Sequence, residues 1–141
     1  MTLQIVARTG KRAYPPRVTE FTRTFWDGLM RGRFMITKCR ACGHMSFPPK
    51  RICAECWARD TEWIDHSGRG ILYSQSVVNA AAFYFTAELP FRLGIIDLAE
   101  GPQIATRLLG PDPAPPLGSA VELVTLSYED GPLYAARLPG A

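Results

Sequence analysis

The sequence predicts a mainly β protein with three parts: an N-terminal helical segment, a compact metal-binding unit and a small C-terminal barrel of about five strands. Three observations support this prediction. Apolar residues recur at helical spacing before residue 33, and all four cysteines stand between residues 39 and 56. From residue 70 onward, short runs of alternating apolar residues are separated by Gly and Pro, which is typical of strands and turns.

Size and composition fit a single folded domain. The chain has 141 residues, of which 47% are hydrophobic and 21% charged, as is usual for a globular domain. No apolar run approaches the ~18 residues that a membrane helix needs. The first 17 residues are too polar, and too often interrupted by Gly and Pro, for a signal peptide. We therefore expect a cytoplasmic protein without a membrane segment.

Residues 19–32 are predicted to form an amphipathic helix that Gly32 ends. An apolar stripe at i, i+4 and i+8 is formed by Phe21, Phe25 and Leu29. This stripe either packs on the chain's own domain or docks on a partner protein. An N-terminal appendage adds little core to so small a domain, so we treat the three residues as candidate partner contacts. Residues 33–39 then alternate as a strand that leads into the first cysteine pair.

The four cysteines form two C-x-x-C pairs that ten residues separate: Cys39, Cys42, Cys53 and Cys56. In a reducing cytosol two such pairs are seldom disulfides, whereas two short knuckles supply the four thiolates that a tetrahedral Zn²⁺ ion requires. A redox dithiol is the alternative, and iron in the same cage stays open. Because four protein ligands close the coordination sphere, we predict a structural zinc ion without a catalytic role.

Neighbouring residues refine the predicted knuckles. His44 follows Cys42 too closely to join the same ion easily, so we interpret it as a solvent-facing or supporting histidine. Gly43 supplies the positive φ that a tight knuckle needs, whereas Trp57 holds the matching position and predicts a different or looser turn. Four basic residues are expected to offset the net negative charge of a zinc ion bound by four thiolates: Lys38, Arg40, Lys50 and Arg51.

The C-terminal half has the period-two pattern of short strands. Strands are predicted over residues 70–79, 91–101 and 103–110, and a hairpin over residues 120–140 turns at Asp130 and Gly131. The Pro-rich residues 110–119 form a loop between strands. Five such strands indicate a small closed or partly open barrel.

Taken in order, these motifs resemble the DUF35 family of acyl-CoA-associated proteins. The resemblance rests on the segments FWDGLMRGRF, CRACG, FPPKRICAEC, GRGILYSQSVV, LGIIDLAEG and LGSAVELV, within residues 14–139. It implies a rubredoxin-like zinc ribbon and a five-stranded OB-fold barrel, with parts at residues 1–37, 38–66 and 67–141. Family members are typically non-catalytic partners of thiolase-superfamily enzymes, including thiolases, acyltransferases and steroid side-chain aldolases. The matching residues are Phe25, Trp26, Gly32, the four cysteines, Pro48, Pro49, Gly68, Gly70, Gly101, Gly118 and Val121.

Charge and side-chain chemistry separate the competing functions. Residues 1–60 carry 12 Lys and Arg against 4 Asp and Glu, whereas residues 61–141 carry 4 against 9. Single-stranded nucleic-acid binding is the alternative function, but an OB barrel that binds a nucleic acid needs a cationic groove and this barrel is acidic. Catalysis by this chain alone is also disfavoured. Asp65 and His66 are adjacent in an extended segment, so their side chains point to opposite faces.

Three consecutive aromatic residues follow Ala82: Phe83, Tyr84 and Phe85. They cannot all face one core, so we expect at least one on the surface, where exposed aromatic residues are typical centres of protein interfaces. The alternative is an irregular strand buried in the barrel. We predict a non-catalytic, zinc-binding subunit that forms a hetero-oligomer with a thiolase-like enzyme acting on acyl-CoA or a related acyl donor. CoA or the acyl group is a candidate ligand shared with that partner.

Overall fold

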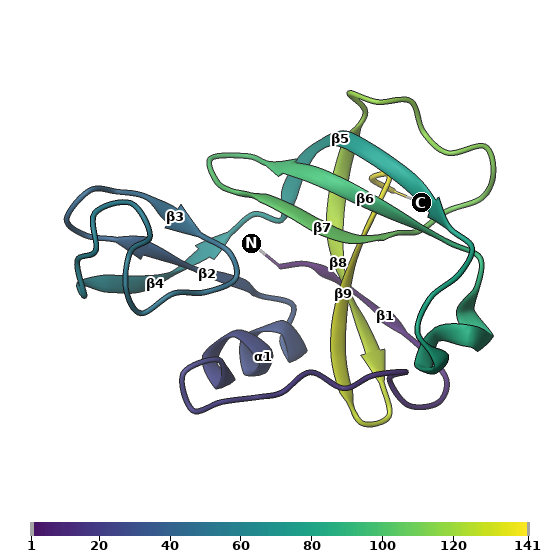
Figure 1. The fold of residues 1–141 in the computed structure, drawn as a ribbon, viewed down its shortest axis with the longest axis horizontal. Helices are drawn as coiled ribbons and strands as arrows, with labels where there is room; N and C mark the ends of the chain where they lie inside the picture. The colour runs from purple at the N-terminus through teal and green to yellow at the C-terminus, as the bar shows by residue number, and fades with distance from the viewer. Residues whose placement is uncertain (1, 141) are drawn as a thin grey trace.

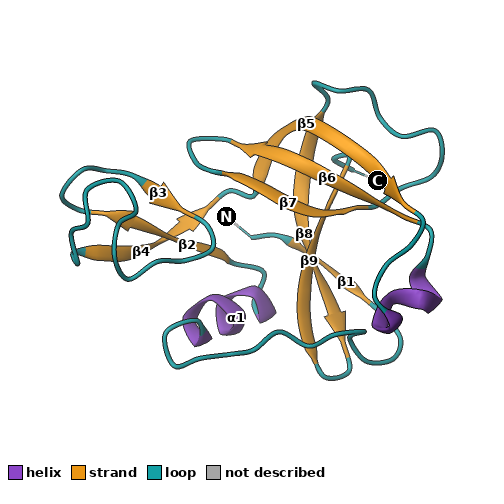
Figure 2. Cartoon of the chain, viewed as in Figure 1, coloured by secondary structure: helices purple, strands orange, loops and turns teal. Residues whose placement is uncertain are grey.

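The computed structural model describes residues 2–140, which form two β-sheets and one α-helix (Figure 1). The smaller sheet has the strand order β3-β2-β4, and the larger has the order β1-β8-β5-β6-β7-β9. Figure 2 shows the two sheets side by side, with α1 below the smaller sheet and beside the lower end of β8 and β9. In chain order the elements are β1 (Gln4–Ala7), α1 (Arg23–Met30), β2 (Phe34–Cys39), β3 (Met45–Ser46), β4 (Thr61–His66), β5 (Arg69–Val78), the 3-10 helix η1 (Phe83–Glu88), β6 (Phe91–Leu98), β7 (Gln103–Leu108), β8 (Ala120–Tyr128) and β9 (Gly131–Arg137).

Five strands of the larger sheet close into a barrel, which confirms the predicted mainly β fold with an OB-fold barrel. Antiparallel pairing joins β5 to β6 and β8, β6 to β7, and β8 to β9. A parallel contact between β7 and β9, at Leu108 and Ala136, closes the ring. β1 lies outside the ring, parallel to β8. Alternate apolar residues of the strands fill the interior, among them Leu72, Ile96, Ile104, Val121 and Leu123.

The helix and the smaller sheet share one hydrophobic core with the barrel. Phe25 and Leu29 of α1 are buried in it together with Phe34 of β2. Thr125 of β8 donates a hydrogen bond from Oγ1 to the Leu29 carbonyl at 3.0 Å, which holds the end of the helix on the barrel. Four aromatic rings surround that of Phe25 at centroid distances of 4.8 to 5.9 Å: Trp26, Phe34, Phe47 and Tyr134. This continuous core fixes the smaller sheet relative to the barrel.

The helix is shorter than predicted, from Arg23 to Met30, and Gly32 follows its end as the predicted stop. Residues 19–22 form a turn instead, because Thr19 and Thr22 each accept a hydrogen bond from the other's backbone amide. Gly32 terminates the helix with φ +74°, and a Cβ at this position would lie 2.8 Å from the Leu3 carbonyl oxygen. A larger residue at position 32 would therefore displace the N-terminal strand as well as strain the turn.

The predicted strands of the C-terminal half are all present as β5 to β9, and residues 33–39 contain β2. The sequence pattern misses β1, which has only four residues and pairs with one strand, so its alternation is too short to detect. The predicted boundary between the first two parts of the chain, at residues 37 and 38, falls inside β2. This strand begins shortly after the helix and ends at the first cysteine. Of the helices formed by residues 2–140, none is long and apolar enough to cross a membrane.

Candidate metal centre and exposed aromatic patch

The structure brings the four cysteines of the smaller sheet together. Cys39 is the last residue of β2 and Cys42 lies in the turn after it, while Cys53 and Cys56 lie in the loop between β3 and β4. All four Sγ atoms lie within 4.8 Å of one another, and two pairs approach to 3.5 and 3.6 Å. Sulfurs on a tetrahedron of about 2.3 Å radius lie ~3.8 Å apart, whereas a disulfide needs about 2 Å. The spacing therefore fits four thiolates on one ion.

The two knuckles are built alike, which corrects the prediction for Trp57. In the first knuckle the Gly43 amide donates to the Cys39 carbonyl at 2.9 Å, and in the second the Trp57 amide donates to the Cys53 carbonyl at 3.0 Å. Gly43 has φ +82° and Trp57 has φ +65°. The expectation of a looser second turn is wrong, because the same hydrogen bond holds Trp57 in the left-handed conformation despite its side chain.

The pKa values of the two thiols in the first knuckle, Cys39 and Cys42, are shifted in opposite directions. A hydrogen bond from the Cys42 amide, opposed by desolvation, lowers the pKa of Cys39 to about 7. The His44 amide lowers the pKa of Cys42, but desolvation and the neighbouring thiols outweigh it and raise that pKa to about 12. Closely spaced thiolates repel one another, and a bound cation would offset this repulsion. Four such donors suit a thiolate-binding metal and leave no open coordination position.

His44 and Arg40 lie next to the cysteine cluster, but the side chain of neither takes part in it. His44 lies outside the cluster, and its carbonyl accepts the Cys39 amide at 2.9 Å, so it supports the first knuckle through the backbone. Arg40 was expected to offset the charge of the metal site, but its guanidinium pairs with Asp60 at 3.1 Å and with Glu62 at 2.8 Å. Because two carboxylates already neutralise the Arg40 side chain, Arg40 does not offset the negative charge of the metal site, contrary to the prediction from the sequence.

Asp65 and His66 do not form an acid–base pair. Asp65 lies on the exposed face of β4 and accepts two hydrogen bonds from Arg33, at 3.1 and 2.6 Å, which lower the pKa of its carboxyl group. His66 is buried on the other face, where Nδ1 accepts the Gly68 amide at 3.0 Å and Nε2 donates to the Ala99 carbonyl. Both ring nitrogens are thus occupied in positioning the connection between β4 and β5.

The apolar stripe of the helix packs on the chain's own domain. Phe25 and Leu29 are buried in the shared core, so neither offers a surface to a partner. Phe21 is half-buried, with its ring centroid 5.1 Å from that of Trp63 and the guanidinium of Arg51 above it at 4.6 Å. The structure therefore corrects the assignment of Phe25 and Leu29 as partner contacts and favours the alternative in which the helix completes the core.

The aromatic residues after Ala82 form η1 and divide between surface and barrel. Phe83 is 88% exposed and Tyr84 is 57% exposed, whereas Phe85 is half-buried against Phe91. This confirms that at least one of the three lies on the surface. Tyr14 of the N-terminal segment packs edge-on against Tyr84, with ring centroids 4.9 Å apart. Sequence reasoning misses Tyr14 because only the fold brings it to η1. We call Tyr14, Phe83 and Tyr84 the aromatic patch.

The barrel does not present a cationic groove. Of the basic residues in the described part of the barrel, Arg69 alone lies outside an ion pair. The other three arginines pair with carboxylates of the barrel and its loops: Arg92 with Asp112, Arg107 with Glu88, and Arg137 with Glu122. Because a barrel that follows a phosphate backbone needs free cationic side chains, this arrangement disfavours nucleic-acid binding.

Two family models match successive parts of the chain. The model described as "ChsH2, rubredoxin-like zinc ribbon domain" matches residues 26–62, which contain the cysteine cluster. The model described as "ChsH2, C-terminal OB-fold domain" matches residues 63–126, which contain most of the barrel. The order of the two matches agrees with the order of the two sheets.

Individual proteins show the same similarity. A DUF35 domain-containing scaffold protein of Methanothermobacter thermautotrophicus is 32% identical over 109 residues, which is 76% of this chain and 82% of that protein. The benzoylsuccinyl-CoA thiolase subunit BbsA of Thauera aromatica is 32% identical over 100 residues, 67% of each chain. A solved structure named "Ltp2-ChsH2(DUF35) aldolase" matches 88% of this chain and 98% of its own, with a TM-score of 0.75 and 25% identity. The cysteine cluster, the barrel and these similarities agree: this chain belongs to the DUF35 family.

Proposed function

We propose that this chain is a non-catalytic scaffold subunit that one Zn²⁺ ion holds in shape and that assembles with a thiolase-superfamily enzyme acting on acyl-CoA or a related acyl donor. The observation that carries this proposal is the exposed aromatic patch, on a fold whose relatives are named as scaffold proteins and as subunits of enzymes. Exposed aromatic residues are typical anchors of protein interfaces, and a monomer gains nothing from keeping them in water.

Zinc suits the cysteine cluster because its donor set consists of thiolates at tetrahedral spacing. The ion would be held by Cys39, Cys42, Cys53 and Cys56. When bound, it contributes to the stability of the fold and supplies no reaction chemistry, because no coordination position is left for a substrate. We infer that the smaller sheet is a structural platform that keeps the helix and the barrel in place.

The side chains of residues 2–140 support an accessory role rather than catalysis by the chain itself. The cysteines face one another in the cluster, and both ring nitrogens of His66 bond to backbone groups. Asp65 is paired with Arg33 on the opposite face of β4. No remaining arrangement in this part of the chain offers a nucleophile beside a general base. The chemistry would therefore belong to the partner.

The N-terminal half supports a position near the CoA of that partner. Its excess of basic residues includes Arg23 and Arg31 at the two ends of the helix and Lys50 near the cysteine cluster, all of them exposed. Exposed cationic side chains attract the phosphate groups of a nucleotide. The barrel would then cover the acyl end of the shared ligand.

Reconstitution of activity tests this proposal. The chain and its partner are purified separately, and acyl-CoA turnover is measured for each alone and for the mixture. The chain alone should show no thiolase, acyltransferase or hydrolase activity, and the mixture should exceed the partner alone. Turnover by the isolated chain that His66→Ala abolishes would refute the scaffold role.

A further inference from the structure

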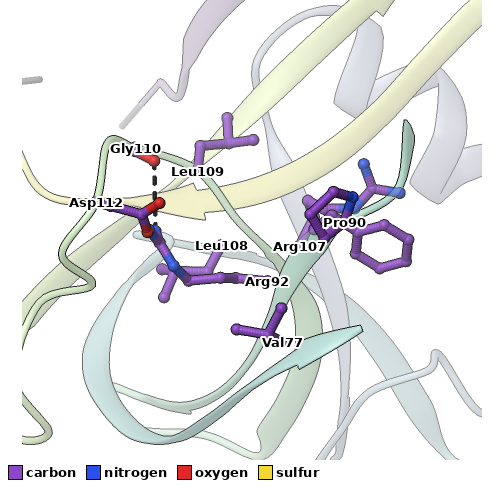
Figure 3. Close-up of a pocket in the computed structure, with 9 residues that line it drawn as sticks. Val77, Pro90, Arg92, Arg107, Leu108, Leu109, Gly110 and Asp112 are labelled. Atoms are coloured by element: carbon purple, nitrogen blue, oxygen red, sulfur yellow. Dashed lines mark hydrogen bonds and ion pairs between the residues drawn. The ribbon is translucent and has the colours of Figure 1, made fainter. Parts of the chain in front are cut away.

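A cavity of about 340 Å³ lies where β5 and β7 end and β6 begins (Figure 3). Its wall combines apolar and charged side chains in about equal measure and comes from β5, β6 and β7 and the residues just before β6 and after β7. Val77, Phe91, Leu108 and Leu109 contribute to this wall. A concave site that places charged groups beside apolar side chains suits a small ligand with one anionic and one apolar end.

One cation of this cavity has an unusual partner. The side chain of Arg92 is only 11% exposed, and Figure 3 shows it reaching from the cavity wall to Asp112 and Gly110. Its Nη1 donates to the Gly110 carbonyl at 3.3 Å and its Nη2 donates to the Asp112 carboxylate. The side chain of Asp112, in contrast, is 91% exposed. A guanidinium that is shielded from water is stabilised by a nearby anion. An exposed carboxylate gains little from an ion pair, because water solvates it about as well as the guanidinium does.

The loop that carries Asp112 is anchored unevenly. Its second half is tied to β5, because the Gln75 side chain donates from Nε2 to the Pro115 carbonyl at 3.1 Å and the Gly118 backbone amide donates to the Leu72 carbonyl at 2.8 Å. Residues 111–114 are held to the barrel, within the described chain, by the single bond between Asp112 and Arg92. Asp112 can therefore leave Arg92 without breaking any other hydrogen bond of the loop.

We propose that Arg92 binds the carboxylate or phosphate group of a small ligand whose apolar part lies against Val77 and Leu108, and that Asp112 occupies the place of that group in the free chain. The second guanidinium of the cavity, Arg107, stays in the wall, because it pairs with Glu88 at 2.8 Å and stacks 3.8 Å above the Phe91 ring. A guanidinium with two accessible N–H groups fits a planar or tetrahedral oxyanion.

A second cavity next to the ion pair of Arg92 and Asp112 supports this proposal. A second cavity of about 500 Å³ includes Val77, Arg92 and Asp112 among its lining residues, together with Gln75 and Pro113. Arg92 and Asp112 thus line both cavities. We expect the two spaces to join around the guanidinium when Asp112 moves away. This site is independent of the proposed scaffold function, because it uses neither the cysteine cluster nor the aromatic patch.

Titration of the isolated, zinc-loaded chain tests the site. Backbone amide shifts of the ¹⁵N-labelled protein are followed with hexanoate and hexyl phosphate as probes, and with inorganic phosphate and hexanol as controls that lack one half of the ligand. We expect shifts at Val77, Leu108 and Leu109 with the amphipathic anions, and weaker binding of both controls. The tighter of the two anions identifies the ligand as a carboxylate or a phosphate.

Four variants distinguish displacement of Asp112 from non-specific binding. Asp112→Asn should bind the anionic probe about fivefold more tightly than the wild type, which corresponds to about 1 kcal/mol. Asp60→Asn, which removes an aspartate from another exposed ion pair, should leave the affinity unchanged. Arg92→Gln should lose at least tenfold, and Arg92→Lys, which keeps the charge without the planar fork, should lose less.

Melting temperatures of all variants establish that they are folded. Equal affinity of Asp112→Asn and the wild type would overturn the proposal, as would binding by a folded Arg92→Gln or Arg92→Lys variant as tight as that of the wild type. Binding of inorganic phosphate as tight as that of the amphipathic anions would also overturn it. Because no partner is present, failure here leaves the scaffold function untouched, and failure of assembly leaves this site untouched.

Discussion

Trp57 is a large side chain on a backbone turn that normally favours glycine. It has φ +65° and is 80% exposed, and the equivalent residue of the first knuckle is Gly43. The left-handed conformation costs a residue with a Cβ about 1–2 kcal/mol. Part of this strain is offset in the unfolded chain, because a tryptophan there has less conformational entropy to lose on folding than a glycine has.

We predict that Trp57→Gly stabilises the zinc-loaded chain by up to about 1 kcal/mol, because the strain is removed while the metal ligands stay in place. Trp57→Ala is the matched control, since it deletes the indole but keeps the Cβ and therefore the strain. Chemical denaturation measures both variants. An equal gain in stability from Trp57→Ala would show that the exposed indole, not the turn, destabilises the protein.

Tyr134 gives the stability of the fold a dependence on alkaline pH. Burial among the aromatic rings of the shared core raises the pKa of its phenol above the usual 10. The unfolded chain therefore releases this proton at a lower pH than the folded chain. Burial of the neutral phenol stabilises the fold fully below about pH 10, and this contribution is lost as the pH rises through the higher pKa of the folded state.

We therefore predict that Tyr134→Phe reduces the loss of stability between about pH 9 and 11, because the variant has no proton to release in either state. Tyr73→Phe, at an exposed position of β5, is the control. This variant should lose as much stability as the wild type over the same pH range. Urea denaturation across this range provides the measurement. An unchanged alkaline slope in Tyr134→Phe would mean that the phenol ionises equally in the folded and unfolded chains.

We expect the smaller sheet to depend on a metal ion, because one of its three strands is very short and the long loop before β4 contains no strand or helix. β3 has two residues, and the segment between β3 and β4 is held by Cys53 and Cys56 at the cluster. Phe34 and Ile36 of β2 also belong to the core shared with the barrel. Loss of the ion should consequently disturb the packing of the helix and the barrel as well as the knuckles.

Elemental analysis should find about one zinc per chain in the wild type. Cys53→Ser should lose the metal and yield unfolded or insoluble protein, because Cys53 is buried and metal binding is coupled to folding. His44→Ala should keep the metal, since His44 supports its knuckle through the backbone carbonyl. A metal-free protein with unchanged stability would contradict the structural role, and loss of zinc in His44→Ala would show that the imidazole contributes to the site.

Local patterns predict most of these elements, and tertiary contacts account for the rest. The helical stripe, the cysteine spacing and the alternation in β5 to β9 are properties of short segments, so the sequence reveals them. Whether the stripe faces the core or a partner depends on β2 and β8, which bury Phe25 and Leu29. β1, the contact of Tyr14 with Tyr84 and the pair of Arg92 with Asp112 join segments far apart in the chain, and no local pattern indicates them.

The aromatic patch is the surface that we expect the partner to cover. Phe83→Ala and Tyr84→Ala should each weaken assembly by about thirtyfold, corresponding to the ~2 kcal/mol typical of a central aromatic anchor. Both residues are mostly exposed, so zinc content and melting temperature should not change. Leu117→Ala, on the Pro-rich loop, is the matched control, because it removes an exposed apolar side chain outside the patch. Unfolding of Phe83→Ala, or unchanged assembly of both variants, would place the interface elsewhere.

Assembly itself can be measured by expressing the chain together with a thiolase-superfamily catalytic subunit of the same organism and determining the mass of the purified species by light scattering. We predict a stable hetero-oligomer that contains zinc and both chains in a fixed ratio. Phe83→Ala should dissociate it, and Leu117→Ala should not. Elution of the two proteins as separate species, with full activity of the catalytic subunit alone, would contradict a scaffold function for this chain.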